Sequence, residues 1–376
     1  MSVSYIPSKV KFELWCRSAG RCQYEGCNKP LWRDALTKAK FNSAYIAHIV
    51  ADKPTGPRGD KSLSKLLKND ISNLMLLCDP HHRLVDIADV QGHPVERLQE
   101  MKKRHERRID IQTSLGDDKQ SHILHYGANI GTLNAKLSWQ KSYEAMSPQR
   151  YPADDNAIEL SMKNSSFTDK EPTFWEIERE NLRRQFTQKV EPRLTSNIGH
   201  LSVFALASQP LLIELGRLLS DVSAMDVYQH QKEPMDSWCW RDEQRHIPYK
   251  IVRPSTTHEQ IALNLSLSAN IDNQRIYSVL GHNVSIWVVT IEEPYNDFLK
   301  TRDQLSDFRR NFRLLLNEIK LSHGQNAILN IFPAAPVSIA VEIGRVWMPK
   351  ADLTLRIFDQ NSAKGGFVQA FDINSF

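Results

Sequence analysis

The chain has 376 residues, of which 41% are hydrophobic and 24% are charged, with five cysteines. This length accommodates two or three domains with cores of their own, and the composition is ordinary for a soluble globular protein. The segment Met1 to Pro7 has no basic stretch before an apolar one, and no run approaches the ~20 apolar residues of a membrane span. We therefore expect a cytoplasmic protein without a membrane partner.

The net charge of +4 hides an asymmetry along the chain. Residues 1–110 carry 20 Lys and Arg against 13 Asp and Glu, whereas the remaining residues carry 28 against 31. The positive charge therefore belongs to the N-terminal part, where it favours a polyanionic substrate such as DNA. The densest basic run, 102–108, is either a DNA contact or the solvated face of a helix.

The N-terminal part predicts a small mixed α+β domain. Apolar spacing indicates a helix over residues 8–19, which stops at Gly20. A cysteine-containing loop, two short strands and a short helix at His82 follow. Pro94 then opens a long helix to about Ile111, which ends the domain.

Three cysteines and a histidine have the spacing of zinc ligands. Cys22 and Cys27 flank a turn at Gly26, and Cys78 and His81 are three residues apart. Zinc takes four N or S ligands, commonly as two close pairs from separate segments. We predict structural Zn²⁺ here, because so small and polar a region has little core of its own. The other cysteines, Cys16 and Cys239, lie outside the set, and nothing suggests a disulfide framework.

Residues 45–86 carry a second pattern. Tyr45–Val50 is an apolar run that contains His48, Asn73 precedes the run Leu74–Cys78, and His82 lies in a short helix. This order resembles the HNH (ββα-metal) nucleases. The resemblance implies that His48 is the general base, that Asn73 braces the loop, and that His82 binds a catalytic Mg²⁺ or Mn²⁺.

The residue before the base departs from the HNH pattern. Many HNH enzymes have an Asp or His metal ligand there, and this chain has Ala47. Asp86 is the best substitute, because it lies at i+4 from His82 and shares its helix face. Asp79 and Asp52 are weaker candidates.

Residues 116–170 are predicted to be a connector between two domains. The segment 116–121 has the composition of a loop, and strand-like pieces occur at His122–Tyr126 and Ile158–Met162.

The C-terminal half contains one strand–turn–helix pattern twice, about 128 residues apart. The strand Leu201–Ala207 is followed by a turn and a helix to Leu219, and 327–332 is followed by a turn and the helix Val337–Arg345. Strand candidates at Ile261–Ser268 and Ser285–Ile291 and helices at Phe174–Val190 and Leu305–Lys320 complete the pattern. Buried strands that alternate with helices predict two Rossmann-like α/β units.

Residues 170–376 resemble the SAVED sensor domains, which join two CARF-like (Rossmann-like) units. The resemblance is carried by Leu201–Leu219, by Asp226–Gln229 with Trp238–Trp240, and by Phe332–Arg345. With the HNH part, the chain resembles the effector nucleases of CBASS anti-phage systems, the CD-NTase-associated proteins. We divide it into an HNH domain (1–115), a connector (116–170) and a SAVED domain (171–376).

The CBASS resemblance implies a ligand, an assembly and a substrate. A cyclic di- or trinucleotide binds SAVED and assembles chains into a homo-oligomer, a dimer or a higher order such as a tetramer. The nuclease then degrades double-stranded DNA.

Phosphates of such a ligand suit the helix N-termini at the carboxyl ends of strands. Aromatic residues could stack on bases or pack in the core, and the Arg241 guanidinium could pair with a phosphate. The candidate ligand residues are Ser208, Gln209, Pro210, Tyr228, Trp238, Trp240, Arg241, Pro333, Ala334 and Ala335.

Two other functions compete with this one. A modification-dependent HNH restriction endonuclease would need a basic C-terminal DNA reader, which the charge of residues 111–376 disfavours. A zinc-stabilised, ligand-sensing DNA-binding regulator without catalysis is favoured only by Ala47.

Overall fold

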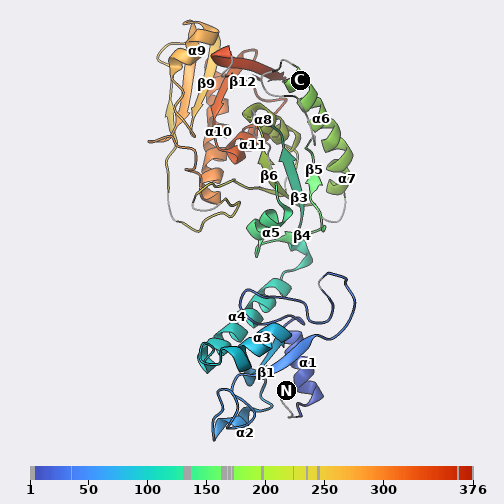
Figure 1. Ribbon diagram of the computed structural model, residues 1–376. Helices are drawn as coiled ribbons and strands as arrows, with labels where there is room; N and C mark the ends of the chain where they lie inside the picture. Colours follow the sequence, from blue (N-terminus) through green and yellow to red (C-terminus); the bar gives the residue numbers. More distant parts are fainter. Residues whose placement is uncertain are drawn as a thin grey trace. The chain divides into compact units, whose positions relative to one another are not determined.

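The computed structural model divides the chain into two compact units, Met1–Gly116 and Asp117–Phe376 (Figure 1). None of the helices it describes is long and apolar enough to cross a membrane. The residues described are 5–34, 36–129, 137–161, 167, 171, 173–195, 199–222, 224–233, 236–243, 246–361 and 364–374.

The first unit is built around a two-stranded antiparallel sheet. Ala44 pairs with Cys78 and His48 with Leu74, and every residue of the second strand is buried. Alternation along a strand gives each face its own side chains. The elements are α1 (Ser8–Arg17), β1 (Ala44–His48), α2 (Leu63–Leu67), η1 (Ile71–Asn73), β2 (Leu74–Cys78), α3 (Asp79–Arg83), the π-helical turn η2 (Leu84–Ala88) and α4 (Val95–Thr113).

The core of this unit is small. Leu14 of α1, Leu76 of β2, Val85 and Leu98 of α4 are fully buried in one apolar cluster. The strand–strand–helix order expected for residues 45–86 is present, and α1 and α4 lie where the apolar spacing placed helices.

The second unit contains two sheets. In the first sheet all strands are parallel, in the order β4-β3-β6-β7, with β5 paired to β3. Its elements and the helices around it are η3 (Asp117–Lys119), β3 (Gln120–Gly127), α5 (Trp139–Met146), β4 (Tyr151–Pro152), β5 (Ile158–Glu159), α6 (Phe174–Lys189), α7 (Glu191–Leu194), β6 (Leu201–Leu206), α8 (Gln209–Leu218) and β7 (Met225–Val227).

The second sheet has six strands in the order β13-β12-β11-β9-β10-β8, of which the middle four are parallel and the two edge strands antiparallel. Parallel strands joined by helices confirm the α/β class predicted for this half. Its elements are β8 (Lys250–Val252), β9 (Gln260–Ser266), α9 (Asn273–Leu280), β10 (Val284–Thr290), α10 (Arg302–His323), β11 (Ile328–Ala334), α11 (Val337–Val346), β12 (Thr354–Asn361) and β13 (Gly366–Ile373).

Helices α8 and α11 lie between the two sheets and belong to one core with strands of both (Figure 1). They are the two helices of the repeated strand–turn–helix pattern. A methyl group on Gly216 would lie 1.9 Å from the carbonyl oxygen of Val341, and one on Gly344 would lie 1.9 Å from that of Ile213. The absence of a side chain at both glycines therefore lets the helix backbones touch.

The segment 116–170, expected to be a connector packed on its neighbours, lies from Asp117 onward in the second unit. Its described parts belong to the compact unit Asp117–Phe376, in which β3 is the direct neighbour of β6. Ile123, Leu124 and Tyr126 of β3 are almost completely buried. The strand expected at Ile158–Met162 is the short β5, and Met162 itself lies outside the described residues.

Candidate functional site

The four predicted zinc ligands meet in the first unit. Ligand atoms of Cys22, Cys27, Cys78 and His81 all lie within 4.8 Å of one another. His81 Nδ1 is 3.1 Å from Cys78 Sγ and 3.6 Å from Cys22 Sγ. Gly26, with φ +78°, forms the turn that returns Cys27 to Cys22. Three sulfurs and one imidazole at this separation are the donor set of a closed, tetrahedral zinc site.

The surroundings of the cluster orient its histidine. The ring of Tyr24 stacks on His81, with centroids 4.1 Å apart and planes 3° apart, and Tyr24 Oη lies 3.0 Å from His93 Nε2. Burial raises the pKa of the Cys22 and Cys78 thiols, so their thiolates need a compensating cation. The donor set and its burial therefore fit a structural metal ion.

The residues of the HNH-like pattern converge on a second place in this unit. His48, His82 and Asp86 line one pocket of about 250 Å³. His48 ends β1, whereas His82 lies in α3 and Asp86 in η2, with His82 Nε2 3.3 Å from Asp86 Oδ2. Burial lowers the pKa of His82 although Asp86 acts in the opposite direction, so its imidazole is neutral at pH 7.

The proton of His48 can be placed from its hydrogen bond. Its Nε2 lies 2.9 Å from the carbonyl oxygen of Lys68. Because a carbonyl only accepts, Nε2 carries the hydrogen and Nδ1 is the basic nitrogen. The side chain is buried but lines the pocket wall.

Asn73 joins the two strands to the segment between them. Its Oδ1 accepts from the backbone N–H of Val50 at 2.7 Å, and its Nδ2 donates to the carbonyls of Val50 at 2.8 Å and Leu67 at 3.2 Å. Three hydrogen bonds from a buried amide fix the chain directly after His48. Asn73 therefore holds the residues after β1 to the segment that precedes β2.

Strand alternation separates Ala47 from the pocket. Ile46 and His48 line it, whereas Ala47 is buried in the apolar cluster of the unit. Of the weaker metal-ligand candidates, Asp52 lines the pocket, and Asp79 instead accepts from Arg83 Nε at 3.0 Å.

Arg58 is a site residue that the sequence reasoning missed. Its buried guanidinium donates to the carbonyl of Ile49 at 2.8 Å, to that of Val85 at 2.6 Å, and to Asp86 Oδ1 at 2.5 Å. It thereby ties the end of β1 to η2 and orients the Asp86 carboxylate, leaving Oδ2 toward His82. Its position between Gly56 and Gly59 signals a tight turn, and Arg58 itself has φ +57°.

In the second unit, the two predicted turns lie side by side. Gln209 at the start of α8 donates through Nε2 to the carbonyl of Ala335 at 2.8 Å, just before α11. Ser208 Oγ and Gln209 Oε1 are buried without a hydrogen-bond partner among the described residues. Pro210 is buried in the first turn of α8, and Pro333 and Ala334 end β11 in register with Leu265 and Ser266 of β9. Two helix N-termini and unsatisfied polar atoms therefore share one location.

The predicted stacking residues Tyr228 and Trp238 are core residues of this unit. The Tyr228 ring stacks on Phe204 at 4.4 Å, and its other interactions include the Arg302 guanidinium at 5.1 Å. Trp238 packs edge-on to Phe204. Trp240 is half-buried, and its indole N–H has no hydrogen-bond partner among the described residues.

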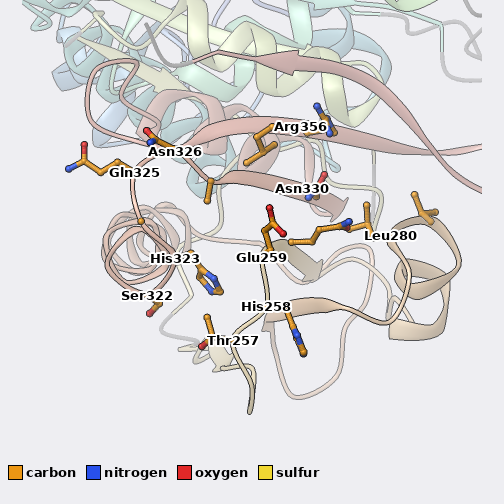
Figure 2. Close-up of a pocket in the computed structure, with 15 residues that line it drawn as sticks. Thr257, His258, Glu259, Leu280, Ser322, His323, Gln325, Asn326, Asn330 and Arg356 are labelled. Atoms are coloured by element: carbon orange, nitrogen blue, oxygen red, sulfur yellow. The ribbon is translucent and has the colours of Figure 1, made fainter.

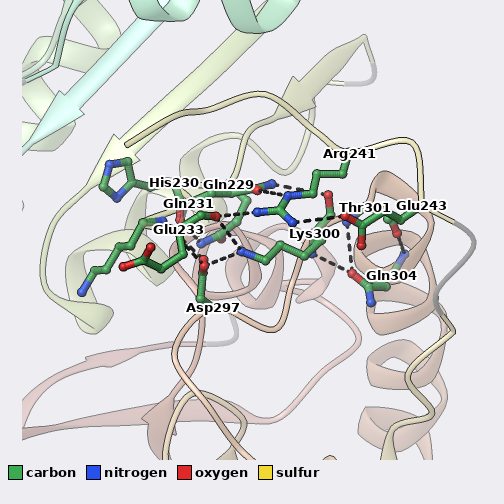
Figure 3. Close-up of polar contacts among 11 residues, drawn as sticks. Gln229, His230, Gln231, Glu233, Arg241, Glu243, Asp297, Lys300, Thr301 and Gln304 are labelled. Carbon is green, nitrogen blue, oxygen red and sulfur yellow. Dashed lines mark hydrogen bonds and ion pairs between the residues drawn. The ribbon is translucent and has the colours of Figure 1, made fainter. Parts of the chain in front are cut away.

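The side chain and backbone of Arg241 are hydrogen-bonded to other groups of the protein (Figure 3). Its Nε donates to Gln231 Oε1 at 3.2 Å, its NH1 to Glu243 Oε1 at 3.1 Å, and its backbone N–H to the carbonyl of Lys300 at 2.9 Å. These bonds tie the segment around Trp238–Trp240 to the start of α10, so the guanidinium already has anionic and carbonyl partners.

A pocket of about 1050 Å³ lies where β9 and β11 of the six-stranded sheet begin, away from the strand ends that lead to α11 (Figure 2). It includes Gln260, Ile328 and Asn330, from the starts of β9 and β11, whereas the predicted turn Pro333–Ala335 follows the end of β11. Within this pocket Asn330 Nδ2 donates to the carbonyl of Ile261 at 2.8 Å. The pocket is therefore distinct from the place where α8 and α11 begin.

Comparison with solved structures finds SAVED receptors. The Acinetobacter baumannii Cap4 SAVED/CARF-domain containing receptor with 2'3'3'-cAAA is 12% identical, with a TM-score of 0.41, over 83% of this chain and 62% of that chain. The same receptor with 3'3'3'-cAAA is 12% identical, with a TM-score of 0.42, over 84% and 72%. The Moraxella osloensis Cap4 receptor is 10% identical, with a TM-score of 0.39, over 84% and 70%. The chain thus spans less than two thirds of the first of these structures.

A comparison with the curated proteins gives no match. The profile of the family described as "SMODS-associated and fused to various effectors sensor domain" (SAVED) matches residues 182–373, about half of the chain. This match confirms the resemblance drawn from the repeated strand–turn–helix pattern and lies within the unit Asp117–Phe376. The chain therefore belongs to the SAVED family.

Proposed function

We propose that this protein is a metal-dependent endonuclease that degrades double-stranded DNA when its SAVED domain binds a cyclic di- or trinucleotide, as an effector of CBASS anti-phage defence. The observation that carries the nuclease part is the convergence of His48, His82 and Asp86 on one pocket, with Asn73 fixing the chain beside it. The observation that carries the sensor part is membership of the SAVED family.

The pocket residues have the chemistry that phosphodiester hydrolysis requires. His48 Nδ1 takes the proton of the attacking water, while the bond from Nε2 to the carbonyl of Lys68 holds the ring in that tautomer. His82 Nε2 and Asp86 Oδ2 would be the imidazole and carboxylate donors for Mg²⁺ or Mn²⁺, which when bound would neutralise charge at the phosphate. Arg58 keeps the Asp86 carboxylate in orientation from its other oxygen.

Zinc bound by Cys22, Cys27, Cys78 and His81 would stabilise the segment that carries His82. Cys78 and His81 flank the junction of β2 and α3, and His82 follows directly. Metal ligation there fixes the start of the helix that carries His82, in a unit whose apolar core is small.

We propose that the cyclic nucleotide binds where α8 and α11 begin. Peptide N–H groups at a helix N-terminus favour phosphate, and two such ends side by side suit a ligand with more than one phosphate. Ser208 Oγ and Gln209 Oε1 supply a donor and an acceptor that have no partner within the described part of the chain. Burial of Tyr228 and Trp238 leaves backbone and small polar side chains as the main ligand contacts.

Ligand binding at this junction is proposed to switch the oligomeric state. The ligand would contact the first residues of both helices, which form the core between two sheets. Binding could therefore shift the equilibrium between two arrangements of α8 and α11. Light scattering with and without the activating nucleotide should show an increase in mass to a dimer or tetramer. One unchanged mass would contradict activation by assembly.

The first test is plasmid cleavage with Mg²⁺, alone and with a panel of cyclic di- and trinucleotides that includes 2'3'3'-cAAA and 3'3'3'-cAAA. Degradation with one ligand only supports the proposal and identifies the messenger. Cleavage without any ligand would favour a restriction-type enzyme. No cleavage under any condition would leave a zinc-stabilised, ligand-sensing DNA-binding protein.

A further inference from the structure

The segment between β1 and β2, residues 51–70, carries a group of exposed lysines and also contributes residues to the pocket that holds His48. Lys53, Lys61, Lys65 and Lys68 are all exposed. Within the described parts of the chain, none of the four side chains makes an ion pair or hydrogen bond. Asp52 and Pro57 of the same segment line the pocket with His48. We call residues 51–70 the β1–β2 insertion.

The β1–β2 insertion is bonded directly to the proposed catalytic residues. His48 Nε2 donates to the carbonyl of Lys68, and Asn73 Nδ2 donates to the carbonyl of Leu67. At its other end, Arg58 donates to the carbonyls of Ile49 and Val85. Residues that carry the lysines are therefore held in a fixed position relative to the base.

The start of α2 is fixed as well. One oxygen of Asp60, Oδ1, accepts from the backbone N–H groups of Ser62 and Leu63, both at 2.8 Å. These bonds lower the pKa of Asp60, which stays ionised at neutral pH and is occupied with the helix start. Asp60 is thus bonded to the backbone at the start of α2, and within the described residues it forms no ion pair with a lysine of the insertion.

Helix α4, which has the densest basic sequence, is different. Arg97 pairs with Glu25 at 2.6 Å, Lys102 is buried against Glu106, and Arg104 pairs with Glu25 at 3.5 Å and with Glu100 at 3.4 Å. Arg108 donates to Asn28 Oδ1 at 2.7 Å. Carboxylates therefore compensate Arg97, Lys102 and Arg104, whereas Arg108 bonds to a neutral amide that leaves its charge in place. Lys103 and Arg107 are exposed, and the structure records no partner for either side chain among the residues that it describes.

We propose that the β1–β2 insertion, and not α4, holds the phosphate backbone of the DNA substrate, through Lys53, Lys61, Lys65 and Lys68. The inference rests on the proposed nuclease function and names the surface that its substrate occupies. Uncompensated lysines release counterions from DNA on binding, whereas lysines already paired with carboxylates gain less. The main-chain carbonyl of Lys68 is hydrogen-bonded to the histidine that would activate water, so this part of the insertion lies close to the proposed site of cleavage.

The test compares two double variants that each remove two positive charges. Lys65→Ala/Lys68→Ala changes the insertion, and Lys103→Ala/Arg107→Ala is the matched control on α4. Both are made in the full-length chain with His48→Ala, so that duplex DNA is not consumed, and the zinc content of each is measured. Fluorescence anisotropy with a labelled duplex is recorded from 50 to 200 mM salt.

We expect the insertion variant to bind DNA about 10-fold more weakly at low salt, and the slope of log K against log salt to fall by about 2 units. The control should change affinity less than about 2-fold. Lys53→Ala/Lys61→Ala should repeat the insertion effect if Lys65→Ala/Lys68→Ala loses zinc or fails to fold. An equal or larger loss in the α4 control would overturn the proposal, as would unchanged binding in both insertion variants.

The outcome is separable from that of the nuclease proposal. Binding is measured without cleavage. A chain that binds DNA through the insertion but never cuts it would contradict the endonuclease proposal and support the DNA-binding surface. A chain that cuts plasmid but binds DNA equally well without the insertion lysines would support the endonuclease and contradict the surface.

Discussion

Gly216 of α8 and Gly344 of α11 face each other across the junction of the two α/β units, and each lacks the side chain that would strike the other helix. A Cβ at Gly216 would lie 1.9 Å from Val341 O, and a Cβ at Gly344 would lie 1.9 Å from Ile213 O. The glycines are 128 residues apart, which is the period of the repeated strand–turn–helix pattern. Each is preceded two residues earlier by a buried glutamate, Glu214 or Glu342, that pairs with arginine. The repeat is thus a packing interface related by approximate symmetry.

Gly216→Ala should destabilise the second unit strongly. Overpacking against backbone atoms costs about 3 kcal/mol, and the better helix propensity of alanine returns only about 1 kcal/mol. Urea unfolding followed by tryptophan fluorescence should show a lower midpoint. Gly199→Ala is the control, because a Cβ there meets nothing within 4 Å, and it should leave the midpoint almost unchanged. Equal midpoints for the two variants would contradict the close helix contact.

Cys27→Ser should reduce the zinc content of the purified chain and destabilise the first unit. A structural zinc ion contributes folding free energy, so losing one of four ligands weakens both metal binding and fold. Zinc is measured by mass spectrometry and stability by thermal unfolding. Cys16→Ser is the matched control, since Cys16 is an exposed cysteine outside the cluster. Full zinc occupancy in Cys27→Ser would remove Cys27 from the ligand set.

His48→Ala should abolish ligand-activated plasmid cleavage, with a loss of about 100-fold or more, because a general base typically contributes that much. Zinc content and cyclic nucleotide binding should stay as in the unmodified chain. His246→Ala, an exposed histidine of the second unit, serves as the control. A His48→Ala chain that still cuts at the normal rate would exclude His48 as the base.

His200 should make the second unit less stable as the pH falls from 7 to 5. Burial, followed by the nearby Arg150, lowers the pKa of His200 to about 4, although Asp226 acts in the opposite direction. Between pH 6.5 and 4 the unfolded chain therefore binds a proton that the folded chain does not, and acid favours unfolding. The expected loss at pH 5 is about 1–2 kcal/mol.

The pH effect is measured as the change in urea midpoint between pH 7 and pH 5. His200→Gln should lose part of this dependence, because glutamine does not titrate and can still bond to Ser121 Oγ, the present partner of His200 Nδ1. An identical pH dependence in His200→Gln and the unmodified chain would contradict the assignment.

Ser208→Ala should weaken cyclic nucleotide binding without loss of stability. Ser208 Oγ makes no capping bond to α8 and is unsatisfied among the described residues, so its removal leaves no group newly unpaired. A hydrogen bond to a charged phosphate is worth about 1.5–3 kcal/mol, which predicts at least about 10-fold weaker binding by calorimetry. Ser278→Ala, an exposed serine on α9, is the control. Unchanged affinity in Ser208→Ala would move the ligand away from the start of α8.

Local patterns in the sequence were sufficient for the elements and for the zinc set. Cys22, Cys27, Cys78 and His81 were grouped by spacing alone, and the structure brings their ligand atoms together. Helix α10 and strands β6, β9 and β11 lie where apolar periodicity predicted them. The elements and each ligand pair depend on neighbours a few residues apart, which turn chemistry and side-chain alternation encode directly. The two pairs, more than 50 residues apart, are joined because zinc takes four ligands.

Several site features could not be found that way. Arg58 reaches Asp86, 28 residues away, and no spacing rule predicts which carboxylate a distant arginine orients. Tyr228 and Trp238 have the composition of a stacking platform, yet they pack around Phe204 because β6 brings that ring to them. The bonding of Arg241 could not be predicted either, because its backbone N–H donates to the carbonyl of Lys300, which lies 59 residues away near the start of α10.

By itself, the sequence determined the α/β class of the C-terminal half, its repeated unit and the cluster of Cys22, Cys27, Cys78 and His81, because these follow from residue type, short-range order and ligand spacing. Only the tertiary structure decided that β3 belongs to the sheet of β6 and that α8 and α11 touch through Gly216 and Gly344. It also decided that, among the described residues, the lysines of the β1–β2 insertion have no ion-pair partner, whereas Arg97, Lys102 and Arg104 of α4 pair with carboxylates. The physical reason is that strand pairing, helix contact and charge compensation depend on which distant segments meet, and the free energy that selects those contacts is spread over the whole core.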